Sequence, residues 1–439
     1  MLPRTITEAA PLIRAGRLSP VELTEAALAA IEKDNRRLNV FLTVTADSVR
    51  EEARRAEQEI RRGRYRGPLH GIPLSLKDLI WTRGVRTTAG SRILKDFVPR
   101  ADAPVVKRLK DAGAVILGKT AMHEWAYGVT NNNPHYGPTR NPHDPERIPG
   151  GSSGGSTVAV ATGMGFASIG TDTGGSIRIP ASLCGVVGLK PTFGLVPVRH
   201  VIPLAASYDH VGPLARSVED AATLFQTMAG KRLPDFRQGA SGLRVGVPEN
   251  FFYDRLEPDV ENAVREAVRR LEQRGARLKK VEVALVREVI PAAITVQLRE
   301  AVRSHLPYRD RRSEYGDAVR ALLERGETVK ASEERAARGV CARFTRELAA
   351  LFRQVDVLVT PTTPATAPRI GQDSIEIAGQ QEDVRPCLTR LVRPFNVAGV
   401  PALSLPFDHD RRGLPIGVQV VGPRRGEAMV LRVGLALED

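Results

Sequence analysis

Two glycine-rich segments of the chain carry serines that could act as nucleophiles. The first runs from Gly150 to Ser156 (GGSSGGS) and the second from Thr171 to Arg178 (TDTGGSIR). Such a composition is often that of a flexible linker, but the apolar runs 158–161 and 166–169 between the segments would anchor both of them in a core. We therefore expect two fixed loops that bracket one packed element.

The second segment could also supply an oxyanion hole. Glycine permits backbone conformations in which consecutive N–H groups converge on one anion, so Thr173, Gly174, Gly175 and Ser176 could together bind the oxyanion of a tetrahedral intermediate. Removing one such donor costs about 3–4 kcal/mol of transition-state stabilisation. Ser176, at the end of this run, is correctly placed to attack a carbonyl group.

The hydroxyl group of a nucleophilic serine needs a base, and no arrangement of the eight histidines marks one out. Lysine can serve instead when burial and nearby N–H dipoles lower its pKa and keep the amine neutral. Lys77 follows an apolar run in the segment 71–78 (GIPLSLKD) and is the candidate base. These residue types favour a serine hydrolase that uses a lysine.

The elements that must position these residues indicate an α/β fold. Short apolar runs without alternation are typical of strands covered on both faces, and they occur at 73–76, 114–117, 243–247, 355–359, 402–406 and 416–421. Helices alternate with them: capping boxes at Thr5 and Ser19 begin two, a third extends to Arg66, and 260–274 forms another. No linker or repeat divides the chain, so we expect one large domain.

Both glycine segments, continued by 184–192 (CGVVGLKPT), resemble the signature of the amidase signature family. The resemblance extends to 71–78, 395–402 (FNVAGVPA) and 415–422 (PIGVQVVG), and it covers nearly the whole chain. It implies one domain over residues 1–439, with a central mixed β-sheet covered by helices on both faces. It also implies a Ser–cisSer–Lys catalytic set with neither a metal nor a cofactor. The two serines of the family lie 24 positions apart, which selects Ser152 rather than Ser153 as the partner of Ser176.

The resemblance implies a proton relay among the three residues. Lys77 would accept a proton from Ser152, and Ser152 one from Ser176, which attacks the substrate carbonyl to form an acyl-enzyme that water hydrolyses. The family holds the peptide bond before the bridging serine in cis, and Gly151 precedes that serine here.

Other residues near the signature are interpreted as structural. We expect Asp172 and Arg178 to support the nucleophile loop and Cys184 to pack in the core. Ser153 and Ser156 could hydrogen-bond to Lys77 or cap the following helix, and we favour the cap.

The substrate pocket is expected at Met122, Trp125, Tyr127 and Gly151, because relatives in the family form part of their pocket near 122–131. Trp125 and Tyr127 could make an aromatic wall that stacks on a ring. The predicted substrates are therefore small, apolar or aryl amides, and esters or carbamates are chemically accessible to the same relay. We expect a monomer or homodimer.

Three alternatives compete with this hypothesis. Within the family, the glutamine-hydrolysing subunit of a tRNA-dependent amidotransferase has an acidic residue shortly before its Pro-x-Asn segment, whereas 387–394 (CLTRLVRP) has no carboxylate. Residues 113–120 (GAVILGKT) match a nucleotide-binding P-loop, but their variable positions read as an apolar strand. Residues 151–155 match a nucleophile elbow at Ser153, but the three prolines in 141–149 exclude the strand that an elbow must follow.

Composition limits the cellular setting. The formal net charge is +14, from 64 basic and 50 acidic residues, and without a nucleic-acid motif we interpret it as a solvated surface and expect no nucleic-acid partner. No apolar run is long enough to span a membrane, and three scattered cysteines fit a reducing compartment. We therefore expect a cytoplasmic protein that does not associate with membranes.

Overall fold

A mixed sheet of eleven strands runs through the protein, whose structure, a computed structural model, describes residues 2–438. Its strands are, in spatial order, β1 (Phe41–Val44), β3 (Val115–Thr120), β2 (Pro73–Lys77), β6 (Ala167–Asp172), β8 (His210–Ala215), β7 (Val187–Lys190), β14 (Ala402–His409), β15 (Pro415–Val421), β11 (Val357–Pro361), β9 (Arg244–Pro248) and β10 (Arg277–Val281). Two short hairpins, β4 (Asn132–Asn133) with β5 (Gly137–Pro138) and β12 (Ser374–Ile377) with β13 (Gln380–Asp383), lie outside it.

Helices connect and cover these strands. The α-helices are α1 (Ile6–Arg14), α2 (Pro20–Leu38), α3 (Ala46–Arg61), α4 (Pro104–Asp111), α5 (Gly154–Ala161), α6 (Arg178–Cys184), α7 (Val218–Ala229), α8 (Pro258–Gln273), α9 (Val286–His305), α10 (Asp317–Thr328), α11 (Ala331–Leu351), α12 (Val384–Arg390), α13 (Arg393–Val397) and α14 (Glu427–Glu438). Three 3₁₀ turns complete the set: η1 (Arg92–Leu94), η2 (Glu124–Ala126) and η3 (Leu306–Glu314).

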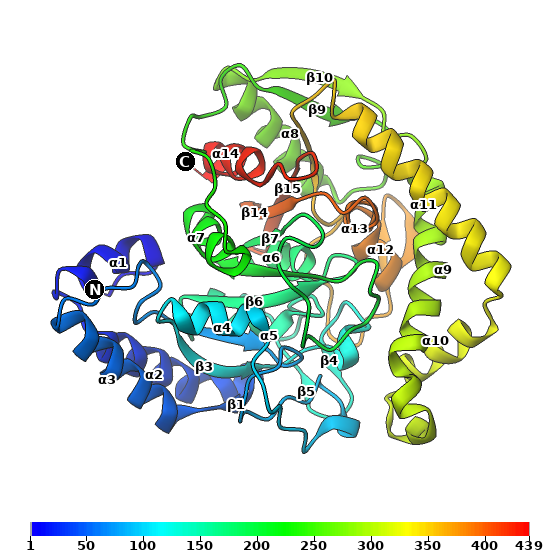
Figure 1. The fold of residues 1–439 in the computed structure, drawn as a ribbon. Coiled ribbons are helices and arrows are strands. Elements are labelled where there is room, and N and C mark those ends of the chain that lie inside the picture. Colours follow the sequence, from blue (N-terminus) through cyan, green and yellow to red (C-terminus); the bar gives the residue numbers. More distant parts are fainter. Residues whose placement is uncertain (1, 439) are drawn as a thin grey trace.

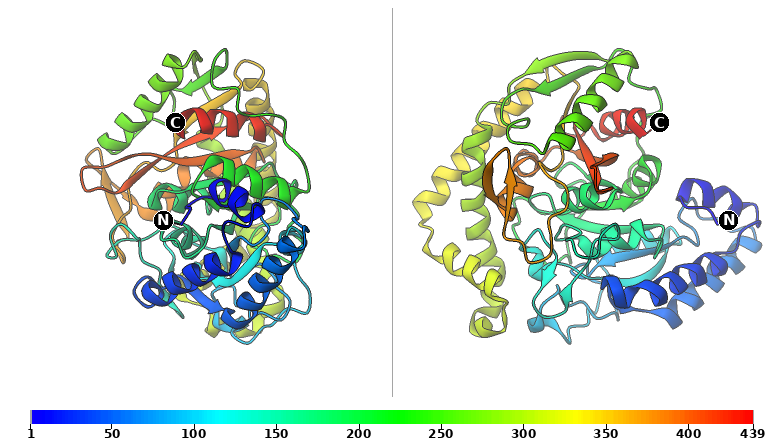
Figure 2. Two further views of the ribbon diagram at one scale, coloured as in Figure 1. Left: turned by 90° about the vertical axis from the view of Figure 1, so that its left-hand side faces the viewer. Right: turned by 180° about the vertical axis from the view of Figure 1, so that it is seen from behind.

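The two faces of the sheet are covered by different helices. Helices α7, α8 and α14 pack on one face through the largest apolar core, where Leu224, Leu271 and Leu431 meet strand residues such as Val420. Helices α5 and α6 pack against the other face. The long helices α9 and α11 pack together in a layer along one side, with α10 at its end and α12 and α13 between it and the sheet (Figures 1 and 2).

The predicted α/β fold is confirmed. All six apolar runs form strands of this one sheet, and the helix expected at 260–274 is α8. The third helix ends at Arg61 rather than Arg66, because Gly63 adopts a left-handed conformation (φ 79°) that terminates it. No helix within residues 2–438 is long and apolar enough to cross a membrane.

The sheet brings distant parts of the site to one edge. Strand β2 pairs in parallel with β6, through Leu74–Ala167 and Leu76–Ile169. The carboxyl ends of parallel neighbours lie at the same edge of a sheet, so Lys77 at the end of β2 meets Thr171 and Asp172 at the end of β6.

Candidate active site

Lys77 lies in the interior next to three hydroxyl groups. Its Nζ atom lies 2.7 Å from Ser152 Oγ, 3.0 Å from Ser153 Oγ and 2.8 Å from Thr171 Oγ1. Within the described residues these hydroxyls are its only hydrogen-bond partners. Burial lowers the pKa of Lys77 from 10.5 to about 7, against the attraction of Asp172 and Asp209. A large fraction of the amine is therefore neutral near pH 7.

The hydrogen bonds of Ser153 decide which hydroxyl can give a proton to Lys77. Ser153 Oγ donates to the backbone oxygen of Thr171 at 3.1 Å, so its proton is engaged and its oxygen accepts from Lys77. A neutral amine has two N–H donors and one lone pair. With one N–H directed to Ser153, the lone pair remains for Ser152 or Thr171.

The prediction that Ser153 and Ser156 cap the following helix is wrong. Ser153 occupies the N-cap position of α5 but makes no side-chain cap hydrogen bond, because its hydroxyl turns toward Lys77. Ser156 lies inside the helix, where its Oγ is 2.7 Å from Thr120 Oγ1. Cys184 is a buried thiol whose pKa is raised by burial, as expected for a core residue.

Ser152 and Ser176 come from two loops that are tied together by the backbone. The Ser153 N–H donates to the Ser176 carbonyl oxygen at 3.2 Å, and the peptide bond between Gly151 and Ser152 is cis. Ser176 is 6% exposed, and its hydroxyl forms no hydrogen bond in the described part of the chain, including none to Ser152. Of the two contacts that the expected relay needs, the one between Lys77 and Ser152 is formed. The one between Ser152 and Ser176 is not formed, and no hydrogen bond within residues 2–438 holds the Ser176 hydroxyl in another direction.

Asp172 organises the loop that carries Ser176. Its carboxylate accepts the N–H groups of Gly175 at 2.7 Å and Ile177 at 3.2 Å, and it pairs with the buried Arg178 at 3.0 Å. Although burial opposes ionisation, Arg178 holds the pKa of Asp172 well below its usual range. The pair therefore gives the structural support that the sequence predicted for it.

The structure leaves fewer candidate N–H donors for the oxyanion hole than the sequence suggested. Because the Gly175 N–H already donates to Asp172, it is not available for a substrate oxyanion. The N–H groups of Thr173, Gly174 and Ser176 form no hydrogen bonds with the described residues. These three groups remain as candidate donors.

A cavity of about 500 Å³ is lined by residues that lie next to both serine loops. Its walls come from residues 123–130 and from α9, α10, α12 and α13. A methyl group built on Gly151 would lie 3.2 Å from Val129, and one built on Gly174 would lie 3.1 Å from the Arg393 guanidinium carbon. Since Val129 and Arg393 line the cavity, it lies close to both serine loops. A smaller cavity of about 80 Å³ is lined by Thr171 and Thr173 themselves.

The structure changes the predicted pocket. Tyr127 lines the cavity, and Gly151 packs directly behind it. Trp125 instead packs edge-to-face against His305 in the core, at 4.6 Å between ring centroids, and Met122 is fully buried. Of the two rings predicted to form an aromatic wall, only Tyr127 lines this cavity, and Trp125 adopts a left-handed backbone conformation (φ 53°).

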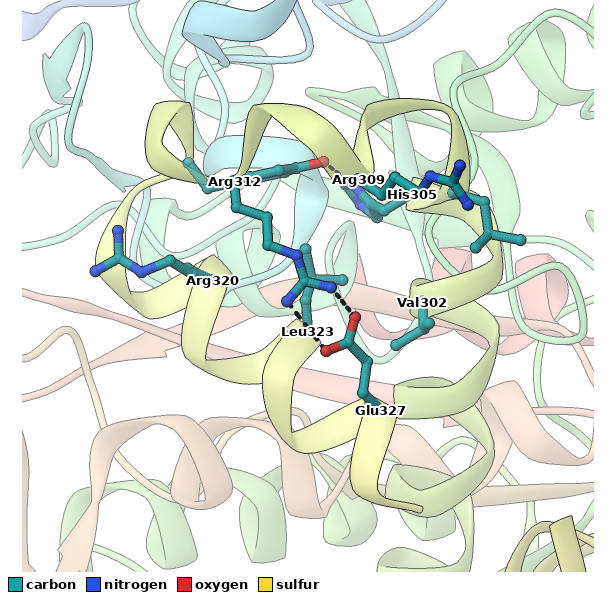
Figure 3. Close-up of a pocket in the computed structure, with 9 residues that line it drawn as sticks. Val302, His305, Arg309, Arg312, Arg320, Leu323 and Glu327 are labelled. Atoms are coloured by element: carbon teal, nitrogen blue, oxygen red, sulfur yellow. Dashed lines mark hydrogen bonds and ion pairs between the residues drawn. The ribbon is translucent and has the colours of Figure 1, made fainter. Parts of the chain in front are cut away.

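A second hollow lies on a different part of the molecule, the helical arm formed by α9, η3 and α10 (Figure 3). Arg312 and Glu327 bridge it by an ion pair, and Val302 and Leu323 form its floor. Its volume is about 30 Å³, the space of one water molecule. It is too small for a substrate.

The structure contradicts both alternative motifs, the P-loop at 113–120 and the nucleophile elbow at 151–155. Residues 115–120 of the P-loop match form the buried strand β3, and Lys119 Nζ bonds to Thr87 Oγ1 at 2.8 Å instead of facing a phosphate site. No strand is present between residues 141 and 149, so Ser153 does not stand on a nucleophile elbow.

Several site residues were not predicted from the sequence. Thr171 contacts Lys77, and Gln297, Arg385 and Arg393 line the cavity. The run from 385 to 393 contains three arginines and no acid. This cluster of positive charge was the sequence feature that could have pointed to Arg385 and Arg393. Gln297 lies on α9 far away in sequence, and no motif marks it.

Fold and site together define an α/β enzyme with a buried lysine and two adjoining serine loops. A sequence model described as Amidase matches residues 22–431. An amidase of Pseudomonas putida is 40% identical, covering 99% of this chain and 95% of its own. A glutamyl-tRNA(Gln) amidotransferase subunit of Lachnospira eligens is 36% identical, covering 100% and 98%. A crystal structure of an amidase superposes with a TM-score of 0.94 at 39% identity, covering 99% of both chains.

The chain belongs to the amidase family, also called the amidase signature family. It is an enzyme of the kind that acts on carbon–nitrogen bonds.

Proposed function

We propose that this protein hydrolyses the C–N bond of small amides, with Ser176 as nucleophile, Ser152 as proton relay and Lys77 as base. The observation that supports this most strongly is the buried amine of Lys77. Its pKa of about 7 and its three hydroxyl neighbours, without a paired carboxylate, suit a neutral base.

The reaction begins when a substrate carbonyl carbon enters beside Ser176. The Ser176 hydroxyl turns toward Ser152, gives it a proton, and Ser152 passes its own proton to the lone pair of Lys77. Contacts of this kind are often open in the free enzyme and close when substrate binds. The Ser176 oxygen then forms a bond to the carbonyl carbon, and the carbonyl electrons move onto its oxygen.

The oxyanion is stabilised by the free N–H groups of Thr173, Gly174 and Ser176. When it collapses, the C–N bond breaks and the relay returns the proton to the departing nitrogen, which leaves as an amine or ammonia. Water then enters, and its oxygen bonds to the acyl carbon while the relay takes one of its protons. The bond between that carbon and the Ser176 oxygen breaks, the relay returns the proton to Ser176, and the acid leaves. Ser153 and Thr171 hold Lys77 in place during both steps.

For the substrate, the glutamine side-chain amide is the better-supported candidate. Four relatives that are 36–38% identical to this chain carry the name of a glutamyl-tRNA(Gln) amidotransferase subunit. The case for apolar or aryl amides depended on a second aromatic ring at Trp125, which does not reach the cavity. Polar residues such as Thr130, Gln297 and Arg393 line that cavity together with apolar ones such as Ile294 and Leu322.

A substrate panel tests the proposal. We expect the purified chain to hydrolyse glutamine or another primary amide faster than a p-nitroanilide or a carbamate. Reaction with a fluorophosphonate should label wild type and not Ser176→Ala. Glutamine hydrolysis only after addition of a partner protein would identify an amidotransferase component. Labelling that persists in Ser176→Ala would contradict the assignment of the nucleophile.

A further inference from the structure

Three arginines from three different helices line the cavity beside Ser176. Arg325 on α10 is exposed, Arg385 on α12 is half-buried, and Arg393 at the start of α13 is only 5% exposed. Other buried arginines of the protein pair with carboxylates: Arg178 pairs with Asp172, and Arg390 pairs with Glu382 at 3.6 Å, although its Nε lacks a hydrogen-bond partner among the described residues.

Within residues 2–438, no carboxylate forms an ion pair with any of the three cavity arginines. Arg393 Nη1 donates to Gln297 Oε1, whereas its Nε is buried without a partner. The Arg385 guanidinium lies over the Tyr127 ring, 5.1 Å from its centroid. A buried donor without an acceptor is costly, so an acceptor from outside the protein would be favoured here.

The remaining charged groups of the cavity do not neutralise the arginines. Asp373 and Asp383 lie on the exposed rim. His123 lines the wall, and burial lowers its pKa to about 3, so its ring is neutral. Burial and the nearby Arg385 lower the pKa of Arg393 to about 10, which leaves it charged at neutral pH. The inner wall is therefore cationic.

Arg393 also lies next to the reaction centre. A methyl group on Gly174 would be 3.1 Å from its guanidinium carbon, and Gly174 is two residues before Ser176. An anion held by Arg393 would thus be within a few bonds of a carbonyl carbon at Ser176.

We propose that Arg393 and Arg385 form a carboxylate subsite, so that the preferred substrates are short amides whose acyl part ends in a carboxylate. A planar guanidinium edge matches the two oxygens of a carboxylate. Arg325 adds attraction from the rim. This inference rests on the proposed amide hydrolysis, and glutamine, which carries a carboxylate, satisfies it, whereas an apolar anilide does not.

The test compares an anionic and a neutral ligand of similar size. Succinamate ends in a carboxylate, and 4-methylpentanamide replaces that group with an uncharged isopropyl group. Calorimetry with the Ser176→Ala variant measures binding without turnover. We expect succinamate to bind at least about tenfold more tightly, because hydrogen bonds to charged groups are among the strong ones.

Variants made in the Ser176→Ala background assign the subsite. Arg385→Met should remove the preference for succinamate and leave the binding of 4-methylpentanamide unchanged. Arg393→Lys retains a charge but lacks the planar edge, so it should weaken the preference for succinamate. Arg320→Met is the matched control, because Arg320 lies on the same helix as Arg325 but pairs with Asp317 outside the cavity; it should change neither affinity.

Equal affinity for the two ligands, or no binding of succinamate, would overturn the subsite. An equal loss of both affinities in Arg385→Met would do the same, since it would show a structural role. Fluorophosphonate labelling of wild type separates this result from a failure of the proposed function: labelled Ser176 without a charge preference refutes only the subsite, and unlabelled Ser176 refutes the nucleophile.

Discussion

Lys77→Met should abolish hydrolysis and yet stabilise the folded protein at neutral pH. The amine is fully buried and loses its hydration on folding, which is why its pKa is lowered from 10.5 to about 7. Methionine has a similar length and no charge to desolvate. The substitution therefore removes both the proposed base and a source of instability.

The magnitude depends on pH in a definite direction. Between pH 7 and 10.5 the unfolded chain binds the proton on Lys77 more often than the folded chain does, so wild type gains stability as pH rises through this range. The folded-state penalty is roughly 4 kcal/mol at pH 7 and about 1 kcal/mol at pH 9.5. Losing three hydrogen bonds costs the variant about 3 kcal/mol at every pH.

The sum of these two effects predicts that the stability difference between Lys77→Met and wild type changes sign with pH. Relative to wild type, Lys77→Met should be more stable by about 1 kcal/mol at pH 7 and less stable by about 2 kcal/mol at pH 9.5. Urea unfolding of both proteins at pH 6.5, 7, 8.5 and 9.5 measures this difference, and titrations common to both proteins cancel. A stability difference that does not vary with pH would mean that Lys77 keeps an ordinary pKa, and the neutral-base mechanism would fail with it.

Three further outcomes follow from the same site. In wild type, kcat/KM should fall on acidification with an apparent pKa near 7, roughly tenfold per pH unit below it, as Lys77 becomes charged; a flat profile to pH 5 would contradict a neutral lysine. Ser153→Ala removes an acceptor that favours the charged amine, so the acid limb of that profile should move to lower pH while kcat drops, and an upward movement would reverse the assigned hydrogen bond. Asp172→Asn leaves Arg178 buried without its counter-charge and should cost about 3–5 kcal/mol of stability in thermal or urea unfolding; an unchanged midpoint would show that the pair does not support the loop.

The strand positions could be predicted because each depends on local composition. A strand covered on both faces is apolar over most of its length, and β2, β3 and β15 are buried at every residue. The end of α3 was less predictable, because an arginine-rich stretch continues the helical pattern past Gly63 and only the backbone conformation shows where the helix stops.

The pocket could not be predicted in the same way. Trp125 and Tyr127 are two residues apart, and their opposite destinations depend on a left-handed turn that alternation in the sequence does not reveal. Gln297, Arg325 and Arg393 meet only because α9 and α10 fold back over α13. The direction of the Ser153 hydroxyl likewise depends on the position of the Thr171 carbonyl oxygen, to which it donates a hydrogen bond.

The sequence by itself determined the α/β class, the lysine that ends a buried strand and the two serine loops, because these depend on apolar runs and on glycines that are close in the chain. The tertiary structure decided which hydroxyls surround Lys77, which N–H groups of the nucleophile loop are free, and that the cavity wall is cationic. Those properties arise from side chains that are distant in sequence, and their distances, burial and pairing exist only after the sheet and the helical layer have come together.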